Sequence, residues 1–459
     1  METSIKEASN RGEFGTGSVR RHLLRLAVPM TAAQLINLLY SVVDRMYLGR
    51  LADTGSLALT GVGIVLPVIS ILTAFTMLCG TGGAPLFSIA RGRGDHDEAE
   101  KILGNSFSLL MLMGIITTTI VIIFKKPILY AFGASDDTFP YANEYLTIYT
   151  IGTIFVMIGL GMNPFINAQG AAKRGMMTVA IGAVVNIVLD PVFIFVLDMG
   201  VAGAAYATII AQCCSAVWAM LFLCGKRAVC KLRLSCLRLE AKRVGRIVAL
   251  GLSGFVMNLT NSLIQIVCNR TLQAYGGDLY VGVMTVINAL REIIFVPISG
   301  LNSATTPVLG FNYGAGLNER VRQGIRFSIS VTVLYMACMW AIIIGAPRMM
   351  IRIFTDDPEM IAAGVRSVRI YFSMSVIMSL QMSSQVVFLS LGKSKFAVFF
   401  SLLRKAMISA PLTMILPIFI GIDGVFFADM ISQIIGGISC FTVMYFTQYR
   451  KLKEPERLQ

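Results

Sequence analysis

Long apolar segments follow one another along almost the whole chain, with short polar gaps between them. Of the 459 residues, 56% are hydrophobic and 14% are charged, whereas a soluble chain averages roughly 25% charged residues. A membrane-spanning helix needs about 20 apolar residues, so a chain of this length has room for twelve spans and no appended soluble domain. We therefore expect an all-α integral membrane protein with twelve transmembrane helices.

The longest polar interruption lies near the middle and divides six predicted spans from six. We expect a cytoplasmic segment over 1–22, an N-lobe over 23–224, a basic cytoplasmic linker over 225–245, a C-lobe over 246–447 and a cytoplasmic tail over 448–459. No small-residue cleavage site follows the first apolar segment, so we predict no cleaved signal peptide. The predicted spans are 23–47, 57–88, 102–124, 142–165, 177–197, 203–224, 246–272, 280–309, 325–346, 364–389, 397–419 and 424–447.

The two halves repeat each other at a shift of 221 to 224 residues. An even number of spans separates the copies, so both halves share one orientation in the membrane. This pattern predicts two pseudo-symmetric six-helix lobes about an axis along the membrane normal, with substrate between them. The matching pairs are Gly92 and Gly94 with Gly314 and Gly316, AQGAAK (168–173) with SLGKSK (390–395), GVAGAAYATIIAQ (200–212) with GIDGVFFADMISQ (421–433), and Gln34, Asn37 and Ser41 with Asn258, Asn261 and Gln265.

Basic residues concentrate in alternate polar gaps, which hold 29 of the 39 Lys and Arg, with Arg404 and Lys405 counted among the 29. This is the positive-inside distribution, so the formal charge of +14 indicates membrane topology and not nucleic-acid binding. It predicts a multi-pass protein of the cell (plasma or inner) membrane with both termini in the cytoplasm.

The nine cysteines fall in predicted spans or in the basic linker, and none falls in a predicted outer loop. This distribution favours reduced thiols over a disulfide framework. The two histidines lie in cytoplasmic polar stretches, and no His/Cys cluster suggests a zinc or haem site. We expect no cofactor.

The apolar run 181–195 contains Asn186, Asp190 and Pro191. A carboxylate inside a span costs a few kcal/mol even on the mildest insertion scale, so it normally faces a polar cavity or an ion. Asn186 and Asp190 are four residues apart and share one face of a helix. The alternatives are a buried Asp190 satisfied by a neighbouring helix, or a span that ends early.

Three other polar side chains have the predicted depth of Asp190, in the outer half of the first lobe: Asp44, Asn186 and Thr208. Four oxygen-bearing groups at one depth suit a small hard cation such as Na⁺, or a pair of carboxylates that trade a proton. The alternative for Asp44 is an ion pair with Arg45.

The second lobe lacks this acidic cluster, because Cys268 stands where the repeat places Asp44, and Leu412 where it places Asp190. Asp429 and Glu292 are candidates for a second polar site, but structural pairing of Glu292 with Arg291 or with a nearby helix is an equal alternative. A substrate cavity is expected near Asn258, Asn261, Gln265 and Glu292. The 26 methionines suit a cavity that repacks around varied ligands, or simply face lipid.

Four stretches of this sequence together resemble the multidrug and toxic compound extrusion (MATE) family, and look most like its DinF branch. These are NLLYSVVDRMYLGRL in span 1, the AQGAAK turn, NIVLDPVFIF in span 5 and GVAGAAYATIIAQ in span 6. The resemblance implies two six-helix lobes, a central cavity and efflux of organic cations driven by Na⁺ or H⁺. By this resemblance Asp44, Asn186, Asp190 and Thr208 match cation-binding positions. Neighbouring polar positions are Asn163 in GMNPF, together with Gln34 and Asn37.

The predicted function is therefore secondary active multidrug efflux by alternating access, in a protein that acts on small organic cations and is expected to be a monomer. The alternative is a flippase for a lipid-linked saccharide, which should line its cavity with several bases; only Arg45, Arg291 and Arg270 qualify. A membrane enzyme would need a catalytic His or clustered acids at a membrane face, and neither is present. A purely structural membrane protein would not need buried acids.

Overall fold

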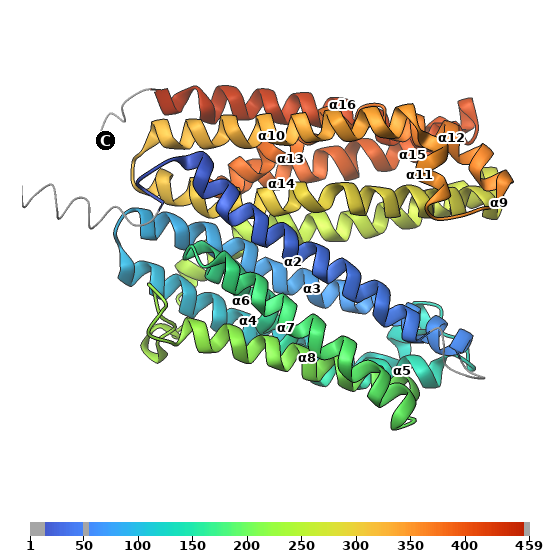
Figure 1. Cartoon of the computed structure of the whole chain (residues 1–459), viewed down its shortest axis with the longest axis horizontal. Coiled ribbons are helices and arrows are strands. Elements are labelled where there is room, and N and C mark those ends of the chain that lie inside the picture. Colours follow the sequence, from blue (N-terminus) through green and yellow to red (C-terminus); the bar gives the residue numbers. More distant parts are fainter. Residues whose placement is uncertain (1–13, 49–54, 454–459) are drawn as a thin grey trace, which may run out of the picture. The chain divides into compact units, whose positions relative to one another are not determined.

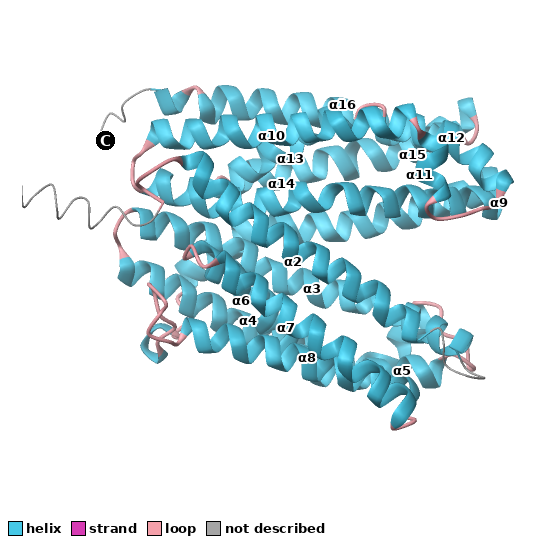
Figure 2. Cartoon of the chain, viewed as in Figure 1, coloured by secondary structure: helices cyan, strands magenta, loops and turns pink. Residues whose placement is uncertain are grey.

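The computed structural model describes residues 14–48 and 55–453, and these residues form helices and no strand (Figure 2). They divide into two compact units. The first is Val28–Gly251, and the second combines the chain before Val28 with the chain from Leu252 onward. We call them the N-lobe and the C-lobe.

The N-lobe contains the helices up to the basic linker (Figure 1). Helix α2 begins in the C-lobe and continues into the N-lobe, because the division falls after Ala27. The elements are α2 (Val19–Leu48), α3 (Gly55–Gly92), α4 (His96–Ala131), α5 (Phe139–Ile151), α6 (Thr153–Ala168), α7 (Ala172–Pro191), the π-helical turn η1 (Val192–Val196), α8 (Gly200–Leu223) and η2 (Leu234–Cys236).

The larger part of the C-lobe begins at Leu252, within α9 (Ala241–Gly314), which is 74 residues long. A single straight helix of that length would extend about 110 Å. Gly277 interrupts it with φ 64° and ψ −164°, so α9 is two spans joined at this glycine (Figure 1). The remaining elements are α10 (Asn318–Gly345), α11 (Pro347–Arg352), α12 (Pro358–Phe372), α13 (Ser375–Ser390), α14 (Ser394–Leu402), the π-helical turn η3 (Leu403–Ser409), α15 (Ala410–Ile420), α16 (Asp423–Met444), η4 (Tyr445–Tyr449) and η5 (Lys451–Lys453).

The described residues account for all twelve predicted spans. Nine helices are long and apolar enough to cross a membrane, and two bent pairs, α5 with α6 and α12 with α13, pass the same test. Since α9 contains two spans, the total is twelve. The prediction of an all-α protein with twelve transmembrane helices is confirmed.

The bent spans occupy equivalent places in the two lobes. The N-lobe pair bends by 57° at Gly152, and the C-lobe pair bends by 46° at Ser373 and Met374. These positions are separated by the shift of the sequence repeat. The repeat therefore preserves a broken helix as well as the order of helices.

Two pairs of turn glycines show the same correspondence. Gly94 and Gly316 have φ values of 77° and 69°, and Gly170 and Gly392 have values of 83° and 70°. Residues with a Cβ atom avoid this left-handed region, because the Cβ would clash with the backbone. The glycines that repeat in the sequence therefore mark the same sharp turns in both lobes.

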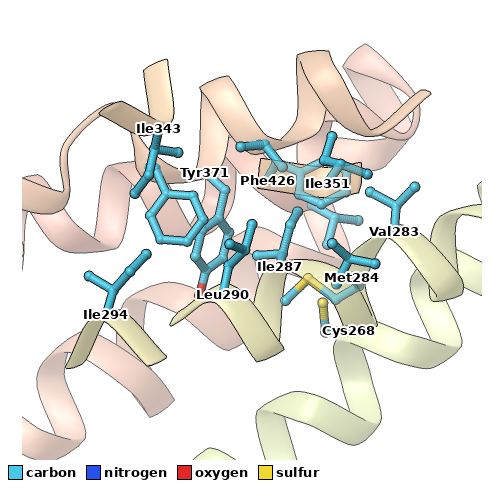
Figure 3. Packing of buried hydrophobic residues seen from close by; sticks show 14 of the residues in the cluster. Cys268, Val283, Met284, Ile287, Leu290, Ile294, Ile343, Ile351, Tyr371 and Phe426 are labelled. Carbon is cyan, nitrogen blue, oxygen red and sulfur yellow. The ribbon is translucent and has the colours of Figure 1, made fainter. Parts of the chain in front are cut away.

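Each lobe has its own apolar core. In the N-lobe, Val65, Leu129 and Leu146 are fully buried members of a cluster that also includes Ala204 from α8. In the C-lobe, Figure 3 shows the cluster around Leu290 and Phe426. Burial of apolar side chains stabilises each lobe through its own helices.

The basic linker packs on the N-lobe. The side-chain Oε1 of Gln169 accepts hydrogen bonds from the backbone N–H groups of Val229 and Cys230, at 2.8 and 3.1 Å. Glu98 pairs with Arg243 at 2.5 Å and with Arg246 at 2.8 Å. The linker belongs to the same compact unit as the N-lobe helices, and the two units divide at Val28 and Leu252. These positions lie a few residues beyond the expected starts of the lobes at 23 and 246.

Candidate functional site

Helix α7 positions Asn186 and Asp190 on one buried face. Their side chains are 1% and 0% exposed, and Asn186 Nδ2 donates to Asp190 Oδ1 at 3.1 Å. The four-residue spacing brings the two side chains one above the other. Pro191 ends α7 and the π-helical turn η1 follows directly.

Helices α8 and α2 supply the other two predicted residues. Thr208 of α8 is buried, and its Oγ1 accepts a hydrogen bond from Asn186 Nδ2 at 3.4 Å. The carboxyl group of Asp44, on α2, lies within hydrogen-bonding reach of Asp190. The structure thus brings Asp44, Asn186, Asp190 and Thr208 together, and we call this group the acidic site.

Two oxygen atoms that α7 contributes to the acidic site have no hydrogen-bond partner among the described residues. They are Asp190 Oδ2 and Asn186 Oδ1, both buried. A buried acceptor without a donor is costly, and most such groups in proteins are paired. These oxygens are therefore available to a proton or a small cation.

A cavity of about 30 Å³ adjoins the acidic site. That is enough room for one or two waters or a small ion. None of the residues that line it is Lys or Arg. The lining includes Asn37 and Tyr40 of α2, Thr178, Gly182, Ala183 and Asn186 of α7, and Gln212 and Ser215 of α8.

The chemistry of the acidic site is that of hard oxygen ligands. Two carboxyl groups, an amide oxygen and a hydroxyl suit Na⁺ or a shared proton better than a soft transition metal. In the part of the chain that is described, no three His, Cys, Asp or Glu side chains gather as a metal cluster. Arg45, the alternative partner of Asp44, has its side chain outside the described residues.

The neighbouring polar residues have different surroundings. Asn37 lines the cavity, whereas Gln34 is exposed and does not. Asn163 lies at the crossing of α6 and α7, where its Nδ2 donates to the backbone oxygen of Gly175 at 3.2 Å. Its observed contact is structural.

The expected substrate residues of the C-lobe also separate into two groups. Asn261 and Gln265 line a second cavity, of about 50 Å³. Asn258 and Glu292 are exposed and lie outside that lining. Asp429, one of the acids noted in the sequence, lines this cavity as well.

Sequence reasoning missed Tyr145, whose side chain is 4% exposed and hydrogen-bonded to Thr208. No pattern in the sequence distinguishes it from the other aromatic residues of its span. Gln212 was also missed, although its repeat partner Gln433 gave a signal. A polar residue that recurs at the same place in two apolar helices faces protein and not lipid.

The structure corrects the interpretation of Arg404 and Lys405, which the analysis of basic gaps counted as cytoplasmic. Both lie in η3, within the span formed by α14, η3 and α15. The Lys405 side chain is 7% exposed. The hydropathy pattern had already placed both residues inside the predicted span 397–419. Two bases so far inside an apolar helix need a buried partner, and the assignment to a cytoplasmic gap did not take this into account.

Comparison with known proteins places this chain in a family. The MatE family model matches residues 29–192 and 254–415. The chain is 22% identical over 435 residues to the multidrug export protein MepA of Staphylococcus haemolyticus, covering 94% of each chain. It is 23% identical over 443 residues to MepA of Staphylococcus aureus strain MSSA476, covering 95% of this chain and 96% of that one.

Solved structures agree on the fold. A crystal structure of MATE in the bent conformation superposes with a TM-score of 0.89 at 23% identity, covering 95% of this chain and 97% of that one. An outward-facing multidrug resistance MATE family transporter of the MOP superfamily gives 0.88 at 23% identity, with the same coverage. The DinF branch stays a prediction. Since the family model matches most of the chain, this protein belongs to the MATE family, whose members are membrane transporters and not enzymes.

Proposed function

We propose that this protein is a secondary active multidrug exporter that moves small organic compounds, mostly cations, out of the cell in exchange for inward Na⁺ or H⁺. The observation that carries the proposal is the acidic site, where a fully buried Asp190 lies against Asp44 and keeps one oxygen unpaired. Relatives that span nearly the whole chain are named multidrug export proteins, which supports the export of drug-like compounds.

Coupling follows from the charge of the acidic site. Two carboxyl groups so close together, with Asp190 fully buried, are unstable when both are ionised, so a proton or a cation is bound in at least one conformation. Transport requires that the coupling ion and the exported compound favour opposite-facing conformations. Asn186 orients Asp190 through its Nδ2, and the oxygens of Asn186 and Thr208 complete the proposed set of ligands.

The same proposal includes the setting of the protein. Its basic gaps support a multi-pass protein of the cell membrane with both termini in the cytoplasm. The proposal takes the protein to act as a monomer. A lipid-linked saccharide flippase is not favoured, because the relatives that cover the chain are named multidrug export proteins.

The test is uptake of a fluorescent organic cation into inverted vesicles with separately imposed Na⁺ and proton gradients. Asp190→Asn and Asp44→Asn should each lower gradient-driven uptake about 5- to 150-fold, the range of ordinary coupling energies. The double variant should be no worse than either single one, because the two acids act as a unit. Folding should be unharmed, since each change removes a buried charge.

Glu144→Gln is the matched control, because Glu144 is an exposed acid of the same lobe. It should leave uptake unchanged. Undiminished gradient-driven uptake by Asp190→Asn, at matched expression, would show that Asp190 is structural and would refute the proposal.

A further inference from the structure

The C-lobe contains a cavity of about 50 Å³ whose walls come from α9, α12, η3, α15 and α16. It occupies the place that the acidic site and its cavity have in the N-lobe. Asn261 corresponds through the repeat to Asn37, and Asp429 corresponds to Thr208. We call it the basic cavity, because Arg291 and Lys405 line it.

Charges around the basic cavity do not balance within the described residues. Lys405 Nζ lies 3.6 Å from Asp429 Oδ1, and Asp429 Oδ2 also accepts a hydrogen bond from Gln433 at 2.9 Å. Arg291 donates to the hydroxyl of Tyr371 at 3.2 Å, which brings no negative charge. One carboxylate therefore faces two cationic side chains in the wall of the cavity.

Arg404 adds a third cation beside Lys405. Its side chain lies against Gly436, and its Nη1 is buried without a hydrogen-bond partner among the described residues. A guanidinium stays protonated in proteins, whereas a buried lysine can release its proton. Even with a neutral Lys405, two guanidinium groups accompany the single carboxylate of Asp429 in this region, because Glu292, the acid next to Arg291, is exposed and lies outside the lining. Burying this excess charge is unfavourable unless an anion offsets it.

The remaining lining supplies hydrogen-bond donors inside an apolar shell. Amide groups come from Asn261, Gln265 and Asn288, and a hydroxyl group comes from Ser409. The hydroxyl of Thr413 already donates to the backbone oxygen of Ser409 at 2.7 Å. Lys405 lies in the π-helical turn η3, a helix distortion that frequently occurs at functional sites. Figure 3 shows Cys268, Met284, Tyr371 and Phe426, four residues of the lining, among the apolar side chains of the C-lobe core.

We propose that the basic cavity binds one compact anion, either a halide or the carboxylate group of a small organic molecule. Arg291 and Lys405 supply the opposite charge, and the amide and hydroxyl groups complete the donor set. A space of about 50 Å³ admits such a group and excludes a diphosphate. This site goes beyond the proposed exchange of cations and is independent of it, since binding requires no gradient.

The test is thermal unfolding of the purified full-length protein at constant Na⁺ and ionic strength, with a bulky organic sulfonate as the reference anion. Chloride and bromide form the halide arm, and formate and acetate form the carboxylate arm. When the free anion is present at about ten times its dissociation constant, its binding should raise the unfolding temperature by about 2 °C. The arm that saturates at lower concentration identifies the natural class of ligand.

Three variants assign the effect to the basic cavity. Arg291→Gln and Lys405→Met should weaken anion binding at least about tenfold, because each removes a buried opposite charge. Asp429→Asn should strengthen it about tenfold, because it removes the one repelling carboxylate. If Arg291→Gln does not fold, the opposite shifts of Lys405→Met and Asp429→Asn still test the proposal. Lys395→Met, an exposed base of the same lobe, is the matched control and should bind as the wild type does.

Two results would overturn the proposal. One is a wild-type protein whose unfolding temperature does not respond to any compact anion, or a Lys405→Met variant that responds as the wild type does. The other is stabilisation by cations at fixed anion that disappears in Asp429→Asn, which would make the cavity a cation site. Neither result bears on gradient-driven uptake, so this proposal and the proposed function fail separately.

Discussion

The two lobes have the same helical plan and opposite charge at their centres. At equivalent positions α7 carries Gly182 and Ala183, whereas η3 carries Arg404 and Lys405. The broken spans, the turn glycines and the polar stripes are kept in both lobes. The apolar and glycine positions determine how the helices pack, whereas a few inward-facing residues determine the charge at the centre of each lobe. A duplicated scaffold can therefore hold acids in one copy and bases in the other.

The largest expected effect comes from moving a base into the N-lobe. A Cβ at Gly182 would contact Ser215 Oγ, which donates to the backbone oxygen of Thr178 at 2.9 Å. Gly182→Arg should therefore destabilise the N-lobe by at least about 3 kcal/mol, through overpacking and through a buried charge without a partner. The measurement is the yield of monodisperse protein together with its unfolding temperature.

The reverse change is the control for that comparison. Arg404→Gly removes a buried charge, which offsets the roughly 1 kcal/mol that a glycine costs inside a helix. This variant should stay folded. Wild-type yield and stability for Gly182→Arg would mean that the two lobes tolerate a base equally, and the contrast between them would lose its structural basis.

A smaller loss of stability, equal in the two lobes, is expected where both lobes make the same contact. Asn163 Nδ2 donates to the backbone oxygen of Gly175 at 3.2 Å, and Gln385 Nε2 donates to that of Ala397 at 3.1 Å. The donors and the acceptors are both separated by 222 residues, the shift of the repeat. Asn163→Ala and Gln385→Ala should each lower the free energy of unfolding by about 1 kcal/mol. Thermal unfolding of the two variants side by side would measure this, and a loss confined to one lobe would contradict it.

A last prediction concerns the basic linker, which packs on the N-lobe and whose expected effect is on reactivity. Burial raises the pKa of the Cys230 thiol to about 11, whereas an ordinary thiol has a pKa near 8.5. Because the thiolate is the reactive form, Cys230 should react with maleimide at pH 7.5 at least about a hundredfold more slowly than the exposed Cys224.

The pH dependence follows from the direction of that shift. The folded protein holds the Cys230 proton more tightly than the unfolded chain, so the contribution to stability is complete below about pH 8.5 and is lost as pH rises towards 11. Labelling of each cysteine, followed by mass spectrometry over this range, checks both statements. Equal rates for Cys224 and Cys230 at pH 7.5 would show that the linker does not stay packed.

Much of the fold was predictable because the membrane requires long apolar helices, and hydropathy records them directly. The face shared by Asn186 and Asp190 followed from helical periodicity alone. The meeting of Tyr145 with Thr208 did not, because it depends on how α5 and α8 pack and no local pattern encodes that contact. The burial of Arg404 and Lys405 could have been predicted from their position inside an apolar span, because a charged side chain there needs a buried partner.

The helix ends at the lobe boundaries have a consequence for how the protein is made. The chain before Val28 belongs to the C-lobe, and Arg320 donates to the backbone oxygens of Phe14, Thr16 and Gly17 at 2.7 to 3.0 Å. At about 5–20 residues per second, the ribosome adds Arg320 roughly 15 to 60 seconds after Gly17. The N-lobe likewise waits for the first residues of α9. Neither lobe can finish folding from its own continuous stretch of nascent chain, so Phe14, Thr16 and Gly17 reach their final contacts only after most of the chain has been synthesised.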